Sequence, residues 1–346
     1  MGVRQSFGFP LSVAIKTDVG RVRSNNEDSH GHAWLDDGSL FVIVADGMGG
    51  HEAGEVASGL AVRVLEEVVS KDPEVDPRER LYNGLLEANE AILEEGRASG
   101  TRGMGTTAIT AVLKGPEIHV GLIGDSRLYH FRRGHLVWRT LDHTRVQMLI
   151  DQGEISEEEG RNHPEAGMLT RALGHARMAD GRPLTPDVLA EPLFIEENDV
   201  VVLSSDGLHD LVEDWEIGQA VAGKVPGEAA QALVEMACER GGHDNVTVAV
   251  ITAGPCAQPY DPEFVPDNLV YDESEEAEVT YDHIHLDENA AQGPAQLQPE
   301  QLGEEDPEQK SSMMLGMAAV GVVGLIVFGI LGLVVVGVAV WFLVPL

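Results

Sequence analysis

Two aspartates in the sequence follow long apolar runs, and each is followed directly by glycine. Asp46 comes after the apolar residues 41–45, and Asp206 follows residues 200–204 after one further serine. A carboxylate at the end of a buried strand costs free energy unless a cation meets it. The glycine lets the backbone approach the same cation closely. A single Asp-Gly pair is typical of a turn, whereas two of them after apolar runs favour a shared metal site.

Two further acidic clusters add oxygen ligands to this set. Residues 25–28 read Asn-Asn-Glu-Asp, and residues 243–245 read His-Asp-Asn. Hard cations such as Mg²⁺ or Mn²⁺ prefer such carboxylate and carbonyl ligands, and Zn²⁺ does not. A dinuclear centre of this kind is suited to the attack of a metal-activated water on a phosphoryl group. Arg23 is the candidate for holding the phosphate, because its guanidinium can bind two oxygens at once.

The overall composition excludes some classes of partner. The 346-residue chain has 58 acidic and 23 basic residues and a formal net charge of −35, which argues against nucleic acid as a partner. Its two cysteines rule out a disulfide framework and fit a reducing compartment. The N-terminus has no apolar run of signal-peptide length, so we expect the body of the protein to be cytoplasmic.

Three segments of the chain differ in composition. Residues 1–254 mix helical and strand-like patterns with glycine turns, and we expect them to form the catalytic domain. Residues 255–310 are rich in Pro, Gln, Glu and Asp, with Lys310 as their only base. This predicts a disordered acidic linker, which is either a plain tether or an acidic docking motif.

The third segment, residues 313–344, is apolar throughout and long enough for one tilted transmembrane helix. We therefore expect a single-pass anchor in the cell inner membrane. Glycines four residues apart, the usual dimerisation pattern of membrane helices, are missing from it, so we expect a monomer.

Hydrophobic periodicity predicts the elements that must position these residues. Apolar residues at helical spacing predict helices over residues 52–70, 78–98 and 227–240. Runs rich in Val and Ile predict strands over residues 40–45, 106–113, 118–123, 127–132, 200–204 and 245–252. Strands follow one another without helices over residues 106–139, which favours antiparallel sheets over a doubly wound fold.

Taken together and in order, these motifs resemble the metal-dependent protein phosphatase family, the type 2C serine/threonine phosphatases, in its compact bacterial form. The matching segments are residues 23–28 (RSNNED), 46–50 (DGMGG), 105–108 (GTTA), 124–127 (GDSR), 169–174 (LTRALG), 205–207 (SDG) and 242–245 (GHDN). The resemblance covers residues 12 to about 252. It implies an α+β fold, a four-layer αββα sandwich of two antiparallel sheets flanked by helices, with the metals at one end.

The resemblance also implies ligands for the first of two Mn²⁺ or Mg²⁺ ions. Asp46 would bridge both metals, and the carbonyl of Gly47 would bind one of them. Asp206 and Asp244 would complete the shell of the first metal.

The second metal and the substrate phosphate would use residues near the N-terminus. Glu27 would hold the second metal largely through water, with Asp28 in support, and Arg23 would bind the phosphate. Asp125 is either a ligand of a weaker third metal or an aspartate in a hairpin turn.

The chain departs from some eukaryotic members of this family at Met48, where they have a histidine proposed as the general acid. Met48 cannot donate a proton and His51 does not match that position, so a metal-bound water is the expected donor. Residues 142–185 match the variable flap beside the substrate groove. We expect its His143 and His163 to be structural residues rather than acids or bases.

The function implied is that of a metal-dependent protein phosphatase that opposes Ser/Thr protein kinases at the membrane. It would hydrolyse phosphoserine and phosphothreonine by attack of a hydroxide bound to the dinuclear centre. The main alternative is a catalytically inactive, membrane-tethered pseudophosphatase that binds phosphoproteins. It is disfavoured because Glu27, Asp46, Asp206 and Asp244 are all present. A phosphohydrolase of small metabolites and a structural scaffold are the remaining candidates.

Overall fold

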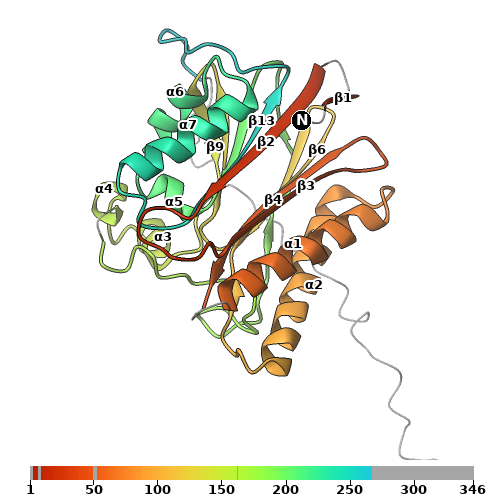
Figure 1. Ribbon diagram of the computed structural model, residues 1–346, viewed down its shortest axis with the longest axis vertical. Helices are drawn as coiled ribbons and strands as arrows, with labels where there is room; N and C mark the ends of the chain where they lie inside the picture. Colours follow the sequence, from red (N-terminus) through yellow and green to blue (C-terminus); the bar gives the residue numbers. More distant parts are fainter. Residues whose placement is uncertain (1–2, 7–8, 50–52, 162, 267–346) are drawn as a thin grey trace, which may run out of the picture. The chain divides into compact units, whose positions relative to one another are not determined.

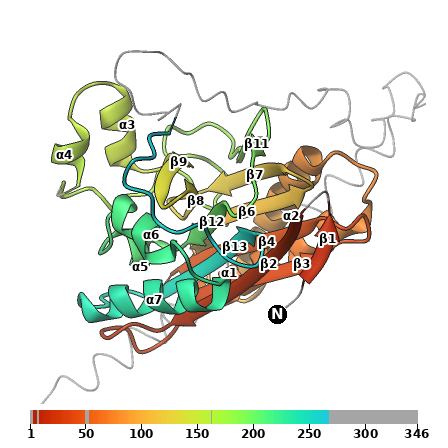
Figure 2. The same ribbon diagram turned by 90° about the horizontal axis from the view of Figure 1, so that it is seen from above.

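The computed structural model describes residues 3–6, 9–49, 53–161 and 163–266. In this part of the chain two antiparallel sheets pack face to face, and helices cover both outer faces (Figures 1 and 2). The predicted α+β arrangement of two antiparallel sheets flanked by helices is therefore confirmed.

One sheet contains both the first and the last strand of the catalytic body. Its strands are, in spatial order, β1 (Val3–Ser6), β2 (Phe9–Asp18), β13 (Val246–Ala253), β12 (Val200–Ser204), β8 (Arg127–Arg132) and β9 (His135–Arg139). Strands β2 and β13 pair from Asp18 opposite Val246 to Leu11 opposite Ala253. This pairing carries the loop after β2 to the turn that precedes β13.

The other sheet holds the first apolar run that ends in Asp-Gly. Its main order is β10 (Asp187–Val188), β7 (Glu117–Ile123), β6 (Ala108–Lys114), β4 (Leu40–Met48) and β3 (Asp28–Trp34), while β11 (Leu193–Phe194) pairs with β7 and β5 (Gly105–Thr106) with β4. Both faces of β4 are buried. Ile43 packs toward the helices and Val44 toward the other sheet, which explains why residues 40–45 of this strand are all apolar.

The helices form the two outer layers (Figure 1). Helices α1 (Ala53–Lys71) and α2 (Pro77–Ala98) cover the sheet of β4, and α5 (Asp206–His209), α6 (Asp214–Val221) and α7 (Pro226–Glu239) lie on the side of β12 and β13. Helices α3 (Arg145–Asp151) and α4 (Glu157–Gly160) belong to the long connection between β9 and β10. Apolar cores fill the three spaces between the four layers.

Helices α1, α2 and α7 agree with their predicted bounds to within one residue. The prediction that Asp46-Gly47 ends its strand is wrong, because β4 continues to Met48 and pairs Gly47 with Thr106 of β5. The predicted strand over residues 106–113 is divided at Thr107 into β5 and β6.

The segment Gly124-Asp125-Ser126 connects the two sheets rather than two neighbouring strands. Strand β7 belongs to one sheet and β8 to the other. The hairpin-turn interpretation of Asp125 is therefore wrong.

The start of the predicted linker is packed on the catalytic body. The backbone N–H of Ala257 donates to the carbonyl of Lys224 (2.9 Å), and Tyr260 stacks on His135 with ring centroids 5.0 Å apart. The rest of the linker, residues 267–310, and the predicted membrane span over residues 313–344 lie outside the described residues. None of the helices that the structure describes is long and apolar enough to cross a membrane.

Candidate metal centre

The predicted site residues come from both sheets and meet at one end of the sandwich. Glu27 and Asp28 stand at the start of β3, and Asp28 lies opposite Asp46 in the pairing of β3 with β4. Asp206 is the first residue of α5, directly after β12. Asp244 lies in the turn that leads into β13.

The backbone of Asp46 is held by two threonines, which leaves its carboxylate free for other contacts. Its N–H donates to the hydroxyl of Thr107 (2.9 Å), and its carbonyl accepts from the N–H of Thr107 (2.9 Å) and the hydroxyl of Thr106 (2.8 Å). Thr107 also contacts the hydroxyl of Ser126 at 2.7 Å. The break between β5 and β6 therefore ties Asp46 to the segment that carries Asp125.

Gly47 is packed so tightly that no other residue fits. A Cβ atom there would lie 2.3 Å from the carbonyl oxygen of Gly54 and 2.4 Å from that of Glu27. Its N–H donates to the same Glu27 carbonyl at 3.2 Å. The start of α1, the end of β4 and the start of β3 can meet only because Gly47 and Gly54 lack side chains.

Asn245 clamps the loop that carries Arg23. Its Oδ1 accepts from the N–H of Glu27 (2.8 Å), and its Nδ2 donates to the carbonyls of Val19 (3.0 Å) and Asn25 (2.9 Å). Arg23 is about half exposed and contacts Asp244 with 2.6 Å between Nη2 and Oδ2. The guanidinium thus lies beside the carboxylates and stays open to solvent, where a phosphate can reach it.

The carboxylates strongly affect one another. Burial raises the pKa of Asp46 well above its usual range, and the neighbouring charges of Asp206, Asp28 and Asp125 raise it further. Burial likewise raises the pKa of Asp206 well above its usual range, with added repulsion from Asp125 and Asp210. The pKa of Asp28 rises to about 6 and that of Asp125 to about 7, in both cases mainly through burial.

Glu27 lies at the edge of this group. Burial raises its pKa, the charge of Arg23 lowers it, and Asp244 and Glu55 raise it again. All seven predicted side chains are therefore linked, either by a direct contact or by mutual repulsion.

These residues fit divalent cations as far as the donor atoms are concerned. Oδ1 of Asp28 and Oδ1 of Asp206 are buried and have no hydrogen-bond partner among the described residues. Within that same part of the chain, no three Asp, Glu, His or Cys side chains are close enough together to enclose a metal ion by themselves. Mg²⁺ commonly keeps several waters and uses one or two carboxylates. The set therefore suits ions whose remaining ligands are water.

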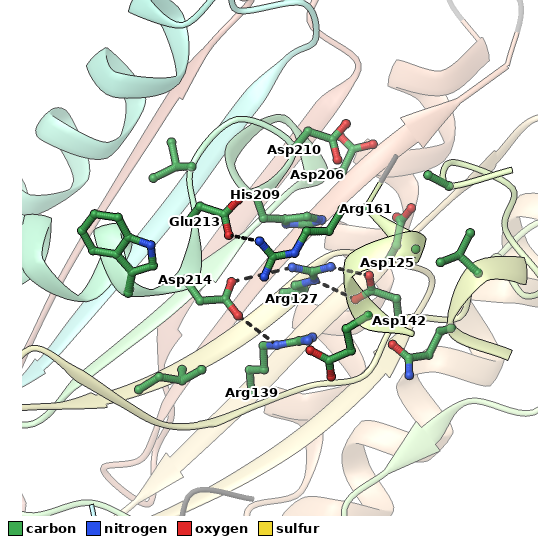
Figure 3. Close-up of a pocket in the computed structure, with 18 of the residues that line it drawn as sticks. Asp125, Arg127, Arg139, Asp142, Arg161, Asp206, His209, Asp210, Glu213 and Asp214 are labelled. Carbon is green, nitrogen blue, oxygen red and sulfur yellow. Dashed lines mark hydrogen bonds and ion pairs between the residues drawn. The ribbon is translucent and has the colours of Figure 1, made fainter. Parts of the chain in front are cut away.

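A cavity of about 970 Å³ opens beside the carboxylates (Figure 3). Asp125 and Asp206 line one end of it, and residues of α3, α4 and α6 line its length. The site can thus be reached by a substrate considerably larger than a phosphate ion.

Comparison with known proteins identifies the family. The sequence profile of the protein phosphatase 2C family matches residues 16–246. The chain belongs to the protein phosphatase 2C family.

Relatives and solved structures agree with this assignment. The serine/threonine phosphatase stp of Listeria monocytogenes (serotype 4b, strain F2365) is 36% identical over 247 residues, which cover 70% of this chain and 95% of that protein. The crystal structure of the Mycobacterium tuberculosis phosphatase PstP/Ppp superimposes with a TM-score of 0.63 at 36% identity, over 70% of this chain and 99% of that one. The structure of the PstP catalytic domain in complex with two manganese ions gives a TM-score of 0.61 at 35% identity, over 70% and 98%.

The expected enzyme class, a protein serine/threonine phosphatase, is confirmed by these relatives. As a member of the protein phosphatase 2C family, the chain belongs to a metal-dependent group of enzymes.

The flap histidine His143 belongs to a buried hydrogen-bond network. Its Nδ1 accepts a hydrogen bond from the N–H of Gly124 (3.1 Å), and its Nε2 contacts Asp187 at 3.0 Å. Nδ1 of His163 accepts from the N–H of Glu165 (3.2 Å). These contacts of the two histidines agree with the structural role that we expected. Met48 ends β4, and His51 lies outside the described residues.

Sequence reasoning overlooked the parts played by Asn245, Thr107 and Asp210. Asn245 and Thr107 stand within the family-like motifs, but only their hydrogen bonds reveal which backbone groups they hold. Asp210 raises the pKa of both Asp206 and Asp125. Its signal was available, because it follows Asp206 by four residues, which places both on one face of a helical turn.

Proposed function

We propose that the chain hydrolyses phosphoserine and phosphothreonine in proteins through a centre of two Mn²⁺ or Mg²⁺ ions. The observation that supports this best is the group of Asp28, Asp46, Asp125 and Asp206, whose pKa values are all raised by burial. Buried carboxylates that repel one another can all be ionised at once only when cations are bound among them.

The ligands proposed for the first ion are Asp46, Asp206 and Asp244. Asp46 would be shared by both ions, and the Gly47 carbonyl would bind one of them. The mutual effect of Asp46 and Asp206 on their pKa values supports placing these two together, and the hydrogen bond from the Gly47 N–H to the Glu27 carbonyl (3.2 Å) holds the Glu27 segment beside them. Glu27 and Asp28 would serve the second ion, and Asp125 a third and weaker one.

Arg23 is proposed to bind the substrate phosphate. Its guanidinium is already beside the carboxylates, it is about half exposed, and it forms an ion pair with Asp244. When bound, the ions would supply an activated water as the nucleophile and neutralise charge on the phosphoryl oxygens. Met48 has no ionisable group, so we assign no side chain of this chain as the proton donor.

The test uses the full chain and a phosphothreonine peptide, with release of phosphate measured in Mn²⁺, in EDTA, and for Asp206→Asn. We expect activity in Mn²⁺, its loss in EDTA, and a decrease of at least about 100-fold for the variant, because the site loses a charged ligand. Glu90→Gln, an exposed change on α2, is the control and should retain full activity.

Two other outcomes would contradict the proposal. Activity that survives both EDTA and Asp206→Asn would exclude the metal centre. Peptide binding without turnover in every divalent metal would favour the pseudophosphatase.

We also propose that the enzyme works at the inner face of the cell membrane. The support is the apolar sequence of residues 313–344 and the acidic segment before it. Phosphorylated proteins and the Ser/Thr kinases that produce them would be its partners there. Isolation of the full chain from membranes without any such kinase or kinase substrate would count against these partners.

A further inference from the structure

The cavity that holds Asp125 and Asp206 is lined by many further residues (Figure 3), and we call it the groove. Residues of α3 and α4 line it from one segment of the chain, and residues of α5 and α6 from another. Its volume of about 970 Å³ lies at the upper end of the range usual for ligand sites. A phosphate group bound near Asp206 would leave most of this space for the residues next to the phosphorylated one.

The groove is rich in carboxylates. Eight Asp and Glu residues and three arginines line it. Each arginine is paired inside the groove: Arg127 with Asp142 (2.7 Å), Arg139 with Asp214 (3.0 Å) and Arg161 with Glu213 (2.9 Å). Figure 3 shows these pairs as dashed lines. The three arginines are therefore offset by three of the eight acids, and the groove keeps an excess of carboxylates.

Besides the proposed metal ligands Asp125 and Asp206, three carboxylates of the groove have no Lys or Arg ion pair among the described residues. Glu157 and Glu158 are exposed residues in the first turn of α4. Asp210 is exposed, and within the described part of the chain its side chain forms an ion pair with His243 alone, at 3.3 Å between Oδ2 and Nε2. None of the three is among the proposed metal ligands, so their charge remains when metals are bound. A groove lined in this way concentrates cationic groups.

Two further side chains of the groove favour a cationic group as its occupant. Trp215 is 59% exposed, and an exposed indole face attracts a guanidinium or ammonium group. Nδ1 of His209 is buried without a hydrogen-bond partner in the described part of the chain. Burial lowers the pKa of His209 well below its ordinary value. The ring is therefore neutral and does not offset the acids.

We infer that this groove selects phosphoproteins with lysine or arginine within a few residues of the phosphorylated one. Glu157 and Glu158 are its specificity-determining residues, and Trp215 provides a face for the basic side chain. This inference rests on the proposed function, since it takes the phosphate to be bound beside Asp206.

The first experiment compares two phosphothreonine peptides that differ only in flanking arginines, which are replaced by glutamines in the second. With the full chain in Mn²⁺, we expect kcat/KM about 3- to 20-fold higher for the basic peptide, as expected for two exposed ion pairs. The difference should lie mainly in KM and shrink in 0.5 M NaCl.

Matched variants assign this preference to the groove. Glu157→Gln with Glu158→Gln should reduce the preference to less than about 2-fold. Glu157→Lys with Glu158→Lys should reverse it, so that a peptide with acidic residues beside the phosphothreonine is preferred. Glu94→Gln with Glu95→Gln, two exposed acids of α2 outside the groove, should leave the preference intact. Hydrolysis of para-nitrophenyl phosphate, which is too small to reach the groove, should be equal in all of these proteins.

Binding to the Asp206→Asn chain separates this inference from the proposed function. Fluorescence anisotropy with labelled peptides should show tighter binding of the basic one even where turnover fails. Equal binding and equal turnover of the two peptides would overturn the inference. A preference that persists in the Glu157→Gln, Glu158→Gln protein would also overturn it.

Discussion

At the scale of single residues, burial changes the behaviour of the acids of this site. Asp125 is only 8% exposed, and its pKa rises to about 7 because burial disfavours its charged form and Asp142 repels it. Asp28 is 9% exposed and its pKa rises to about 6, although Thr247 and Ser205 donate hydrogen bonds to it. Without cations, the folded protein therefore favours protonated carboxyl groups here.

The metal-free protein should consequently become less stable as the pH rises. A carboxyl group whose pKa is raised in the folded protein makes its full contribution to stability at pH values below its ordinary pKa, near 3.8. For Asp125 this contribution is lost as the pH increases through about 7. In EDTA we expect Tm to decrease between pH 5 and pH 8. Asp125→Asn should recover on the order of 2–4 kcal/mol at pH 8. A Tm in EDTA that stays constant over this range would contradict the prediction; Glu90→Gln is the control.

Arg23 should contribute through the shape of its guanidinium as well as its charge. We expect Arg23→Ala to lower kcat/KM for a phosphopeptide by about 10- to 150-fold, as for the loss of a hydrogen bond to a charged group. Arg23→Lys should recover only part of this loss, because an ammonium group cannot bind two oxygens in a plane. Steady-state kinetics measure both variants, and full activity of Arg23→Ala would exclude its proposed role.

At the scale of elements, glycines decide how closely strands and helices approach the site. Gly47 of β4 faces Gly54 of α1, and an added Cβ at Gly47 would lie 2.3 Å from a backbone oxygen. Backbone atoms cannot move aside as the end of a flexible side chain can. The junction of β3, β4 and α1 therefore depends on this residue.

Gly47→Ala should destabilise the protein by at least about 1–3 kcal/mol, as for overpacking of a core. Gly59→Ala in α1 is the matched control, because its Cβ would have its nearest contact at 3.8 Å, with Ser29. At this helical position, alanine is also favoured over glycine by about 1 kcal/mol, so Gly59→Ala should not destabilise the protein. Urea unfolding measures both changes, and equal stabilities of the two variants would show that the junction can relax.

At the scale of the whole molecule, the candidate site requires both sheets at once. The first long strand, β2, pairs with the last, β13, and this brings the Arg23 loop to Asp244. Asp46 lies in β4 of one sheet, and Asp206 follows β12 of the other. We therefore expect the site to form only in the completely folded domain.

The apolar segment should decide where the whole protein resides. We expect the full chain to sediment with membranes and the variant with Ile326→Arg and Leu331→Arg to be released. Each arginine costs about 2.5–3.5 kcal/mol near the centre of a membrane helix. Ile326→Leu with Leu331→Ile is the control. A full chain found only in the soluble fraction would exclude the anchor.

The sequence by itself determined the family resemblance, the main helices and the identity of the candidate acids. Apolar residues recur at helical spacing in α2, so its bounds follow from local pattern, and Pro77 marks its start. The Asp-Gly pairs and the clusters around Glu27 and Asp244 are short motifs, so they can be recognised without knowledge of the fold. Helix α4 and the short strands β10 and β11 contain too few residues to show a period.

Only the tertiary structure decided how these pieces meet. The pairing of Asp18 with Val246 joins residues that are more than two hundred positions apart, and no local pattern encodes such a contact. The course of β4 past Asp46 depends on β5, and the place of Asp125 depends on β7 and β8 lying in different sheets. The clamp made by Asn245 likewise arises from neighbours in space. Hydrophobic periodicity reports which side of an element is buried, but not which other element buries it.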